Sequence, residues 1–163
     1  MIKKILILIV LIFCGTNLYF WTLSDSKIIT RSTESLIECL EKEAGSGRLS
    51  GAISTSTFRD LLDDDIVFQM QRKDIPYKSL VGEHIVKGDL VQIVSGLSQS
   101  DVAIKITDKK ITILSLDDEK ASVKVSFHIT TEKLPKNLDL NVDCDLTYIK
   151  VEDEWRVSRV IIK

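Results

Sequence analysis

The sequence predicts an α+β fold in which helices pack on one face of an antiparallel sheet. Two observations carry this prediction. Apolar residues recur at helical spacing in the first part of the chain, and they alternate with polar residues in the last third. Helices that precede a block of strands are typical of α+β domains, whereas regular alternation of strands and helices would indicate a parallel sheet.

The clearest strand signals lie near the C-terminus. Odd positions over residues 121–129 are apolar and even positions are polar, and residues 138–148 alternate with the opposite parity. Each strand therefore has one buried face and one solvated face. If the two strands pair as a hairpin with matched faces, Lys124 lies opposite Asp145.

The same register brings His128 opposite Asn141, on the solvated face. A third strand is expected to begin at Glu154, after a short polar turn. Its apolar positions change parity between Val157 and Val160, which predicts either a β-bulge between them or partial burial of both faces.

Two long amphipathic helices are expected upstream, over Asp25–Ala44 and Glu83–Leu97. Gly45–Gly51 is predicted to be a linker, because it lacks the lysine and hydroxyl ending of a phosphate loop. A short helix is expected over Thr57–Leu62. The aspartates that follow it, Asp63–Asp65, are predicted to form a solvated turn, since they lack the ligand spacing of a calcium loop.

Further strands are expected at Val102–Ile106 and Ile111–Leu116, and Ile66–Met70 is predicted to be a short strand or a helix end. All these elements fit a single domain over residues 25–163, which is long enough to bury one core.

Residues 1–23 are predicted to be a membrane leader. Lys3 and Lys4 precede the apolar run Ile5–Leu23, which is just long enough to span a bilayer and carries aromatic residues at 19–21, near its far end. An uncleaved signal anchor is the favoured interpretation. A cleaved signal peptide and a lipoprotein signal with lipidation at Cys14 are the alternatives. All three place the domain outside the cytoplasm, and the anchor would hold it to the inner membrane by a single pass.

Composition argues against several classes of partner and cofactor. The formal net charge is −2 and no basic patch follows the leader, so we expect no nucleic-acid binding. His84 and His128 are isolated from any Cys/His pattern, which argues against a zinc site. No cofactor and no metal ligand is predicted.

The order of elements resembles the nuclear transport factor 2-like superfamily, which includes SnoaL polyketide cyclases and ketosteroid isomerases. The resemblance covers residues 25–163 and rests on the opening helix, the helix around Glu83–Leu97 and the closing stretch Lys150–Val157. It implies a cystatin-like cone, in which a curved sheet wraps around helices and encloses a cavity, and often a dimer interface on the outer face of the sheet. Enzymes, binders and assembly modules share this fold, so the fold leaves the function open.

The cavity face that the strand pattern predicts is almost wholly apolar. Its candidate ligand-binding residues are Phe127, Cys144, Tyr148 and Trp155, although residues such as Tyr148 and Trp155 more often belong to a packed core. His128 falls on the solvated face, and no Ser/His/Asp set or carboxylate pair is visible. The sequence therefore predicts no catalytic residue.

Two cysteines could join helix to sheet. Cys39 lies beside the apolar stripe of the first helix, and Cys144 lies on the apolar strand face. In an oxidising compartment they could form a disulfide if their Cα atoms come within about 7 Å. Two separate buried thiols are the favoured interpretation.

Together these features favour a membrane-tethered, extracytoplasmic module without catalytic activity. It would bind a small apolar ligand in its cavity, or an envelope protein through its sheet, and the leader would bind the membrane. An isomerase, cyclase or dehydratase of the same fold is the first alternative, and it requires a polar dyad inside the cavity. A structural homodimer formed through the polar sheet face is the second alternative.

Overall fold

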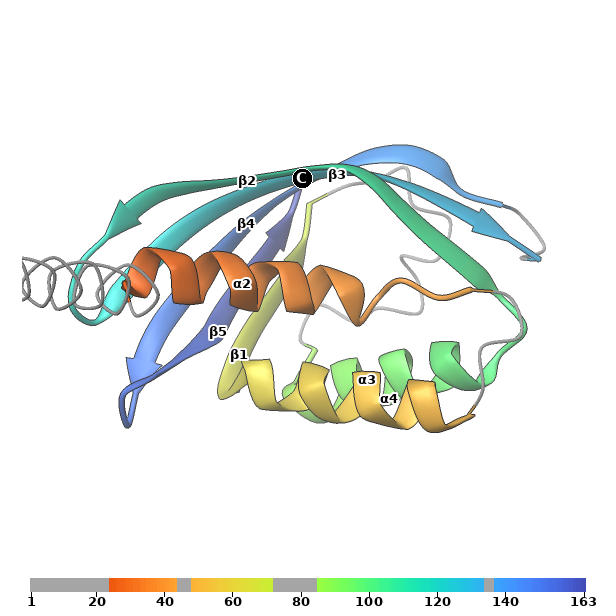
Figure 1. Cartoon of the computed structure of the whole chain (residues 1–163), viewed down its shortest axis with the longest axis horizontal. Helices are drawn as coiled ribbons and strands as arrows, with labels where there is room; N and C mark the ends of the chain where they lie inside the picture. Colours follow the sequence, from red (N-terminus) through yellow and green to blue (C-terminus); the bar gives the residue numbers. More distant parts are fainter. Residues whose placement is uncertain (1–23, 44–47, 72–84, 134–136) are drawn as a thin grey trace, which may run out of the picture.

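A computed structural model describes residues 24–43, 48–71, 85–133 and 137–163. These residues form helices on a five-stranded sheet, which confirms the α+β class (Figure 1). The helices are α2 (Asp25–Glu38), α3 (Arg48–Leu61) and α4 (Lys87–Gln99), and the strands are β1 (Leu62–Met70), β2 (Ala103–Leu116), β3 (Lys120–Glu132), β4 (Asp139–Val151) and β5 (Glu154–Ile162).

The helices lie along one face of the sheet, which curves over them (Figure 1). The strand order is β1-β5-β4-β3-β2. Strands β2 to β5 form antiparallel neighbours, as predicted, but β1 pairs parallel with β5. The predicted all-antiparallel sheet is therefore wrong at this edge, and the sheet is mixed. A parallel pair needs a long connection rather than a tight turn, and α4 and β2 to β4 separate these two strands in the chain.

The β3–β4 hairpin has the predicted register. Lys124 pairs with Asp145, and His128 pairs with Asn141. Val123, which lies on the opposite face from these side chains, is completely buried. Burial of one face sets the register, because a slip of one residue would turn the whole apolar face outward.

Strand β5 begins where predicted and carries the expected bulge. Val157 and Arg159 pair with adjacent residues of β4, so Ser158 is an extra residue in the ladder. The extra residue changes the parity of the strand, and Val160 and Ile162 therefore return to the inner face.

Strand β2 is continuous, whereas the sequence predicts two runs, Val102–Ile106 and Ile111–Leu116. Asp108, which lies between the runs, has a positive φ of 54°. The pairing with β3 is irregular at the same place. A bulge therefore carries one strand through a polar stretch that interrupts the apolar pattern.

Helix α2 is shorter than predicted, since it ends at Glu38 instead of Ala44. After the helix, Lys42 exchanges two backbone hydrogen bonds with Ile104 of β2, with N–O distances of 2.8 and 2.9 Å. This pairing at the edge of the sheet overrides the helix propensity of the acidic residues that follow Glu38.

The predicted linker and short helix belong largely to one helix. Helix α3 already contains Gly51, the last residue of the predicted linker, and Thr57 lies inside α3 rather than at its start. Asp63–Asp65 lie in β1 instead of a turn, at the irregularity in its pairing with β5. The strand alternative for Ile66–Met70 is confirmed.

Helix α4 begins at Lys87, later than the predicted start at Glu83. The predicted leader, residues 1–23, and His84 lie outside the described residues. Within the described ranges, none of the helices is both long enough and apolar enough to cross a membrane.

Candidate functional site

An apolar cavity of about 280 Å³ lies between the inner face of the sheet and the helices. Residues of α2, α3 and α4 and of strands β1, β3, β4 and β5 line it. Among the described residues that form this wall, none carries a side-chain nitrogen or oxygen atom. The cavity is therefore built to hold apolar groups, which lose water on entry without losing hydrogen bonds.

The sheet side of the cavity follows directly from the alternation in the sequence. Side chains from three adjacent strands point inward at every second position. The bulge at Ser158 is essential to this wall, because without it the last apolar residues of β5 would face outward. The six side chains are Val125 and Phe127 of β3, Cys144 and Leu146 of β4, and Val160 and Ile162 of β5.

The helix side of the cavity includes one stripe of α4. Leu90, Ile93, Val94 and Leu97 recur at helical spacing and all line the cavity. Leu90 and Val94 are buried, but Ile93 is 44% exposed. The cavity wall therefore reaches the surface at Ile93.

Cys144 carries the titratable group of the described cavity wall. Burial, with a further contribution from the neighbouring Asp143 and Asp145 carboxylates, raises the pKa of its thiol to about 12. The thiol is therefore protonated at neutral pH, and a protonated thiol is a poor nucleophile and a poor base.

Tyr148 was a predicted ligand-binding candidate, but its side chain lies in the core and not in the cavity wall. Its hydroxyl lies 2.8 Å from Oγ1 of Thr33 on α2. The Thr33 hydroxyl donates to the carbonyl of Ile29 at 2.8 Å, so the Tyr148 hydroxyl must donate to Thr33. Burial raises the pKa of Tyr148. The pair satisfies its own polar atoms and offers none of them to the cavity.

Trp155, the second aromatic candidate, also lies outside the cavity wall. Its Nε1 donates to Asp25, in the first turn of α2, at 2.9 Å. The Lys150 ammonium lies 3.4 Å from the same carboxylate and 5.5 Å from the centre of the indole ring. Together with the Thr33–Tyr148 pair, these contacts hold α2 against the sheet.

Asp25→Ala is expected to lower the free energy of unfolding by about 2 kcal/mol, because it leaves the buried indole N–H of Trp155 without its acceptor. Asp25→Asn is the matched control. It keeps an acceptor oxygen, and we expect it to cost about 1 kcal/mol or less, for the lost ion pair and helix-dipole interaction. Urea unfolding of residues 24–163, monitored by circular dichroism, measures the loss of unfolding free energy in both variants. Equal losses would show that charge, and not the indole hydrogen bond, holds this end of α2.

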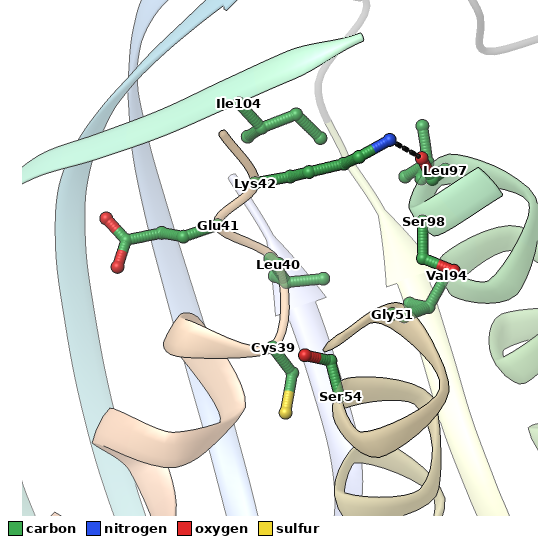
Figure 2. Close-up of a pocket in the computed structure, with 10 residues that line it drawn as sticks. All are labelled: Cys39, Leu40, Glu41, Lys42, Gly51, Ser54, Val94, Leu97, Ser98 and Ile104. Carbon is green, nitrogen blue, oxygen red and sulfur yellow. Dashed lines mark hydrogen bonds between the residues drawn. The ribbon is translucent and has the colours of Figure 1, made fainter. Parts of the chain in front are cut away.

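A second, much smaller cavity lies where the end of α2 meets α3 and α4. Its volume of about 30 Å³ corresponds to a single water molecule. Figure 2 shows the Lys42 side chain extended toward the carbonyl of Leu97, to which its ammonium donates at 2.9 Å. The ammonium also contacts the Ser100 carbonyl. Lys42 therefore caps the C-terminal end of α4, and the cavity belongs to a structural junction.

The two cysteines of the predicted disulfide are free. Cys39 is half-buried and lines the small cavity, whereas Cys144 is buried and lines the large one. The structure therefore holds them as two separate thiols. Cys14, the predicted lipidation site, lies outside the described residues.

His128 lies on the outer face of the sheet and does not line the cavity. Its Nδ1 is 3.0 Å from the side-chain oxygen of Asn141, and its Nε2 is 3.1 Å from the Asp139 carboxylate. On the same face, Ser126 donates to Asp143 at 2.6 Å. Across the described segments, no three histidine, cysteine, aspartate or glutamate side chains gather as metal ligands.

Of the four predicted cavity residues, Phe127 and Cys144 line the cavity, whereas Tyr148 and Trp155 are buried but are not part of its wall. Sequence reasoning missed the contribution of β1. Residues 66, 68 and 70 line the cavity and alternate with more exposed residues, so their parity was visible. The sequence did not show which face of β1 points into the cavity, because that depends on its parallel pairing with β5.

No protein-family model and no curated protein matches this sequence. Solved structures with the same fold do match. A nuclear transport factor 2-like protein from Cytophaga hutchinsonii superimposes with a TM-score of 0.64 at 15% identity, covering 86% of this chain and 98% of that protein. A protein of unknown function with a cystatin-like fold from Nostoc punctiforme gives 0.55 at 11% identity, with coverages of 85% and 89%.

A predicted scytalone dehydratase from Novosphingobium aromaticivorans gives a TM-score of 0.58 at 14% identity, covering 92% of this chain and 87% of that protein. At such low identities the similarity establishes the fold alone. The fold expected from the element order is thereby confirmed.

Proposed function

We propose that this chain, which has the fold of nuclear transport factor 2-like proteins, is a membrane-tethered extracytoplasmic module that binds a small apolar ligand without catalysing a reaction. One observation carries the proposal. The cavity of about 280 Å³ is large enough for a small molecule, and its described wall offers only apolar contacts. Its volume lies just below the usual range for ligand sites, which is about 300–1,000 Å³, and this supports a small ligand.

The chemistry of the wall supports a binder over an enzyme. An isomerase, cyclase or dehydratase needs a proton donor or acceptor within hydrogen-bond reach of its substrate. Among the described wall residues the titratable side chain is Cys144, and burial keeps its thiol protonated at neutral pH. The fold is shared with a predicted dehydratase, but an enzyme here would need a polar dyad that the described wall does not supply.

The proposed tether is residues 1–23, for which the basic start, apolar run and aromatic end are the support. The described chain begins at Ser24, immediately before α2. Near the other end of this helix, Leu36 and Ile37 line the cavity. The helix has 14 residues, so the ligand site would lie about 20 Å along α2 from the leader. An inner-membrane location with the domain outside the cytoplasm is part of the proposal.

A protein partner or a second copy of the chain would use the outer face of the sheet. Lys124 is exposed there, and two carboxylates of β4 are paired: Asp143 accepts from Ser126 of β3, and Asp145 contacts Lys163, which follows β5. A homodimer or an envelope partner remains a prediction from the sequence.

Native mass spectrometry of the full chain, extracted together with its membrane, tests the proposed function. The wild-type protein is expected to carry a bound apolar molecule that appears as a defined mass increment. Ile93→Trp should abolish the increment, because a larger ring at this half-exposed wall position would block the cavity. A tryptophan is tolerated there because the side chain borders solvent.

Ile53→Trp is the matched control, since Ile53 is 61% exposed on α3 and does not line the cavity. The control variant should retain the ligand. A wild-type protein that carries no molecule, or equal occupancy in the two variants, would contradict the proposed function.

A further inference from the structure

We propose that the ligand is the hydrocarbon chain of a single-chain amphiphile, whose polar head stays outside the cavity. This inference rests on the proposed function and specifies its ligand. It follows from three properties of the cavity: the chemistry of its wall, its volume and the contrast between its buried end and its exposed rim.

The wall chemistry restricts what can enter. Because the described wall has no side-chain nitrogen or oxygen, a hydroxyl, amide or charged group inside would lose its water without gaining a partner. The buried hydroxyls of Thr33 and Tyr148 are bonded to each other and not directed at the cavity wall. The part of the ligand that enters must therefore be hydrocarbon.

The volume restricts how much can enter. A volume of about 280 Å³ holds roughly nine groups the size of a water molecule, whose share of liquid volume is about 30 Å³. A methylene group is of similar size. One chain of medium length fits this space, whereas the two chains of a membrane phospholipid do not.

The cavity has a closed end and a rim. Leu62 and Leu146 line the closed end and are 1% and 4% exposed. The wall reaches solvent at Ile93, and it is half-buried at Met70 and Ile162, the paired last residues of β1 and β5.

The chain continues from those two strand ends into polar, exposed residues. Gln71 follows Met70, and Lys163 follows Ile162. A closed apolar end with a polar surface beside its rim matches a molecule that has one apolar end and one polar end. A ligand that is apolar throughout would gain nothing from the polar surface.

Equilibrium dialysis of radiolabelled straight-chain 1-alkanols against the full chain in phospholipid nanodiscs tests this inference. Empty nanodiscs are measured in parallel, so that partition into lipid is subtracted. Affinity is expected to rise about fourfold with each methylene, and to level off between about eight and twelve carbons, when the cavity is full. The matching carboxylates should show the same increment, since their head groups stay outside.

A hydroxyl at the far end of the chain is the sharpest comparison. The α,ω-diol of the best-bound length should bind at least about tenfold more weakly than the 1-alkanol, because its second hydroxyl would enter the apolar closed end. Ile93→Trp should lose binding of the whole series and Ile53→Trp should keep it. Circular dichroism of both variants verifies that they are folded.

The outcomes separate this inference from the function on which it rests. If affinity is independent of chain length, or the diol binds as well as the alkanol, while a compact hydrocarbon such as naphthalene binds, the chain ligand is excluded and the apolar-ligand function stands. If neither alkanols nor naphthalene bind above the empty nanodiscs, both proposals are overturned.

Discussion

Gly51→Ala is expected to lower the free energy of unfolding by about 2 kcal/mol, although alanine is normally the better helix former. A Cβ atom at Gly51 would lie 2.7 Å from Cβ of Ser98 and 2.8 Å from its Oγ. Because Gly51 is on α3 and Ser98 is on α4, the two helices would have to move apart. Urea unfolding of residues 24–163 measures the loss.

Gly96→Ala is the control for helix propensity. A Cβ atom at Gly96 would meet nothing within 4 Å, so we expect this change to stabilise the protein by up to about 1 kcal/mol. The two substitutions are chemically identical, and their effects should have opposite signs. If both substitutions changed the free energy of unfolding in the same direction, the α3–α4 contact would not be tight.

Substitutions at Ser98 test which of its atoms clashes with a Cβ atom at position 51. In the Gly51→Ala background, Ser98→Gly removes the atom nearest to the new methyl group and should recover part of the lost stability. Ser98→Ala keeps that Cβ atom and should not. The spacing of these helices bears on function, because Phe58 of α3 and Leu90 of α4 both line the cavity.

Above pH 9 the protein is expected to lose stability through Cys144. The pKa of this thiol rises from 9.0 to about 12 on folding, chiefly because of burial. Below pH 9 the thiol is protonated in both states and does not affect stability. Between pH 9 and about 12 the unfolded chain releases the proton first, so each pH unit favours unfolding by about 1.4 kcal/mol.

Comparison with Cys144→Ala isolates this contribution from that of other alkaline groups. Between pH 8 and pH 10.5 the wild-type protein should lose about 2 kcal/mol more than the variant. The measurement is a series of urea unfolding curves at fixed temperature and ionic strength. Parallel losses in the two proteins would mean that the thiol titrates as if exposed to water, which would contradict its burial in the cavity wall.

Several features of the sheet could be predicted from local sequence pattern alone. Alternation over two segments was sufficient to predict the register that pairs Lys124 with Asp145. The parity change in β5 predicted its bulge, which lies at Ser158. These features could be predicted because a half-buried strand repeats every two residues, so a wrong register would expose apolar side chains.

The site was predicted only in part. The resemblance implied a cavity and the apolar face of β3 and β4 indicated that it is apolar, and Phe127 and Cys144 line it. Tyr148 and Trp155 share that sequence pattern, yet they pack against α2 outside the cavity wall, where Thr33 and Asp25 accept hydrogen bonds from them. Parity assigns a residue to a face, but it does not show which part of that face a helix covers.

By itself, the sequence determined the α+β class, the period-two faces of the C-terminal strands and the apolar character of the inner face. Only the tertiary structure decided that β1 lies parallel to β5, that α2 ends where Lys42 pairs with Ile104, and that α3 includes Gly51. The physical reason is distance along the chain. Alternation and helical spacing are properties of neighbouring residues, whereas these three features depend on contacts between segments that the sequence keeps far apart.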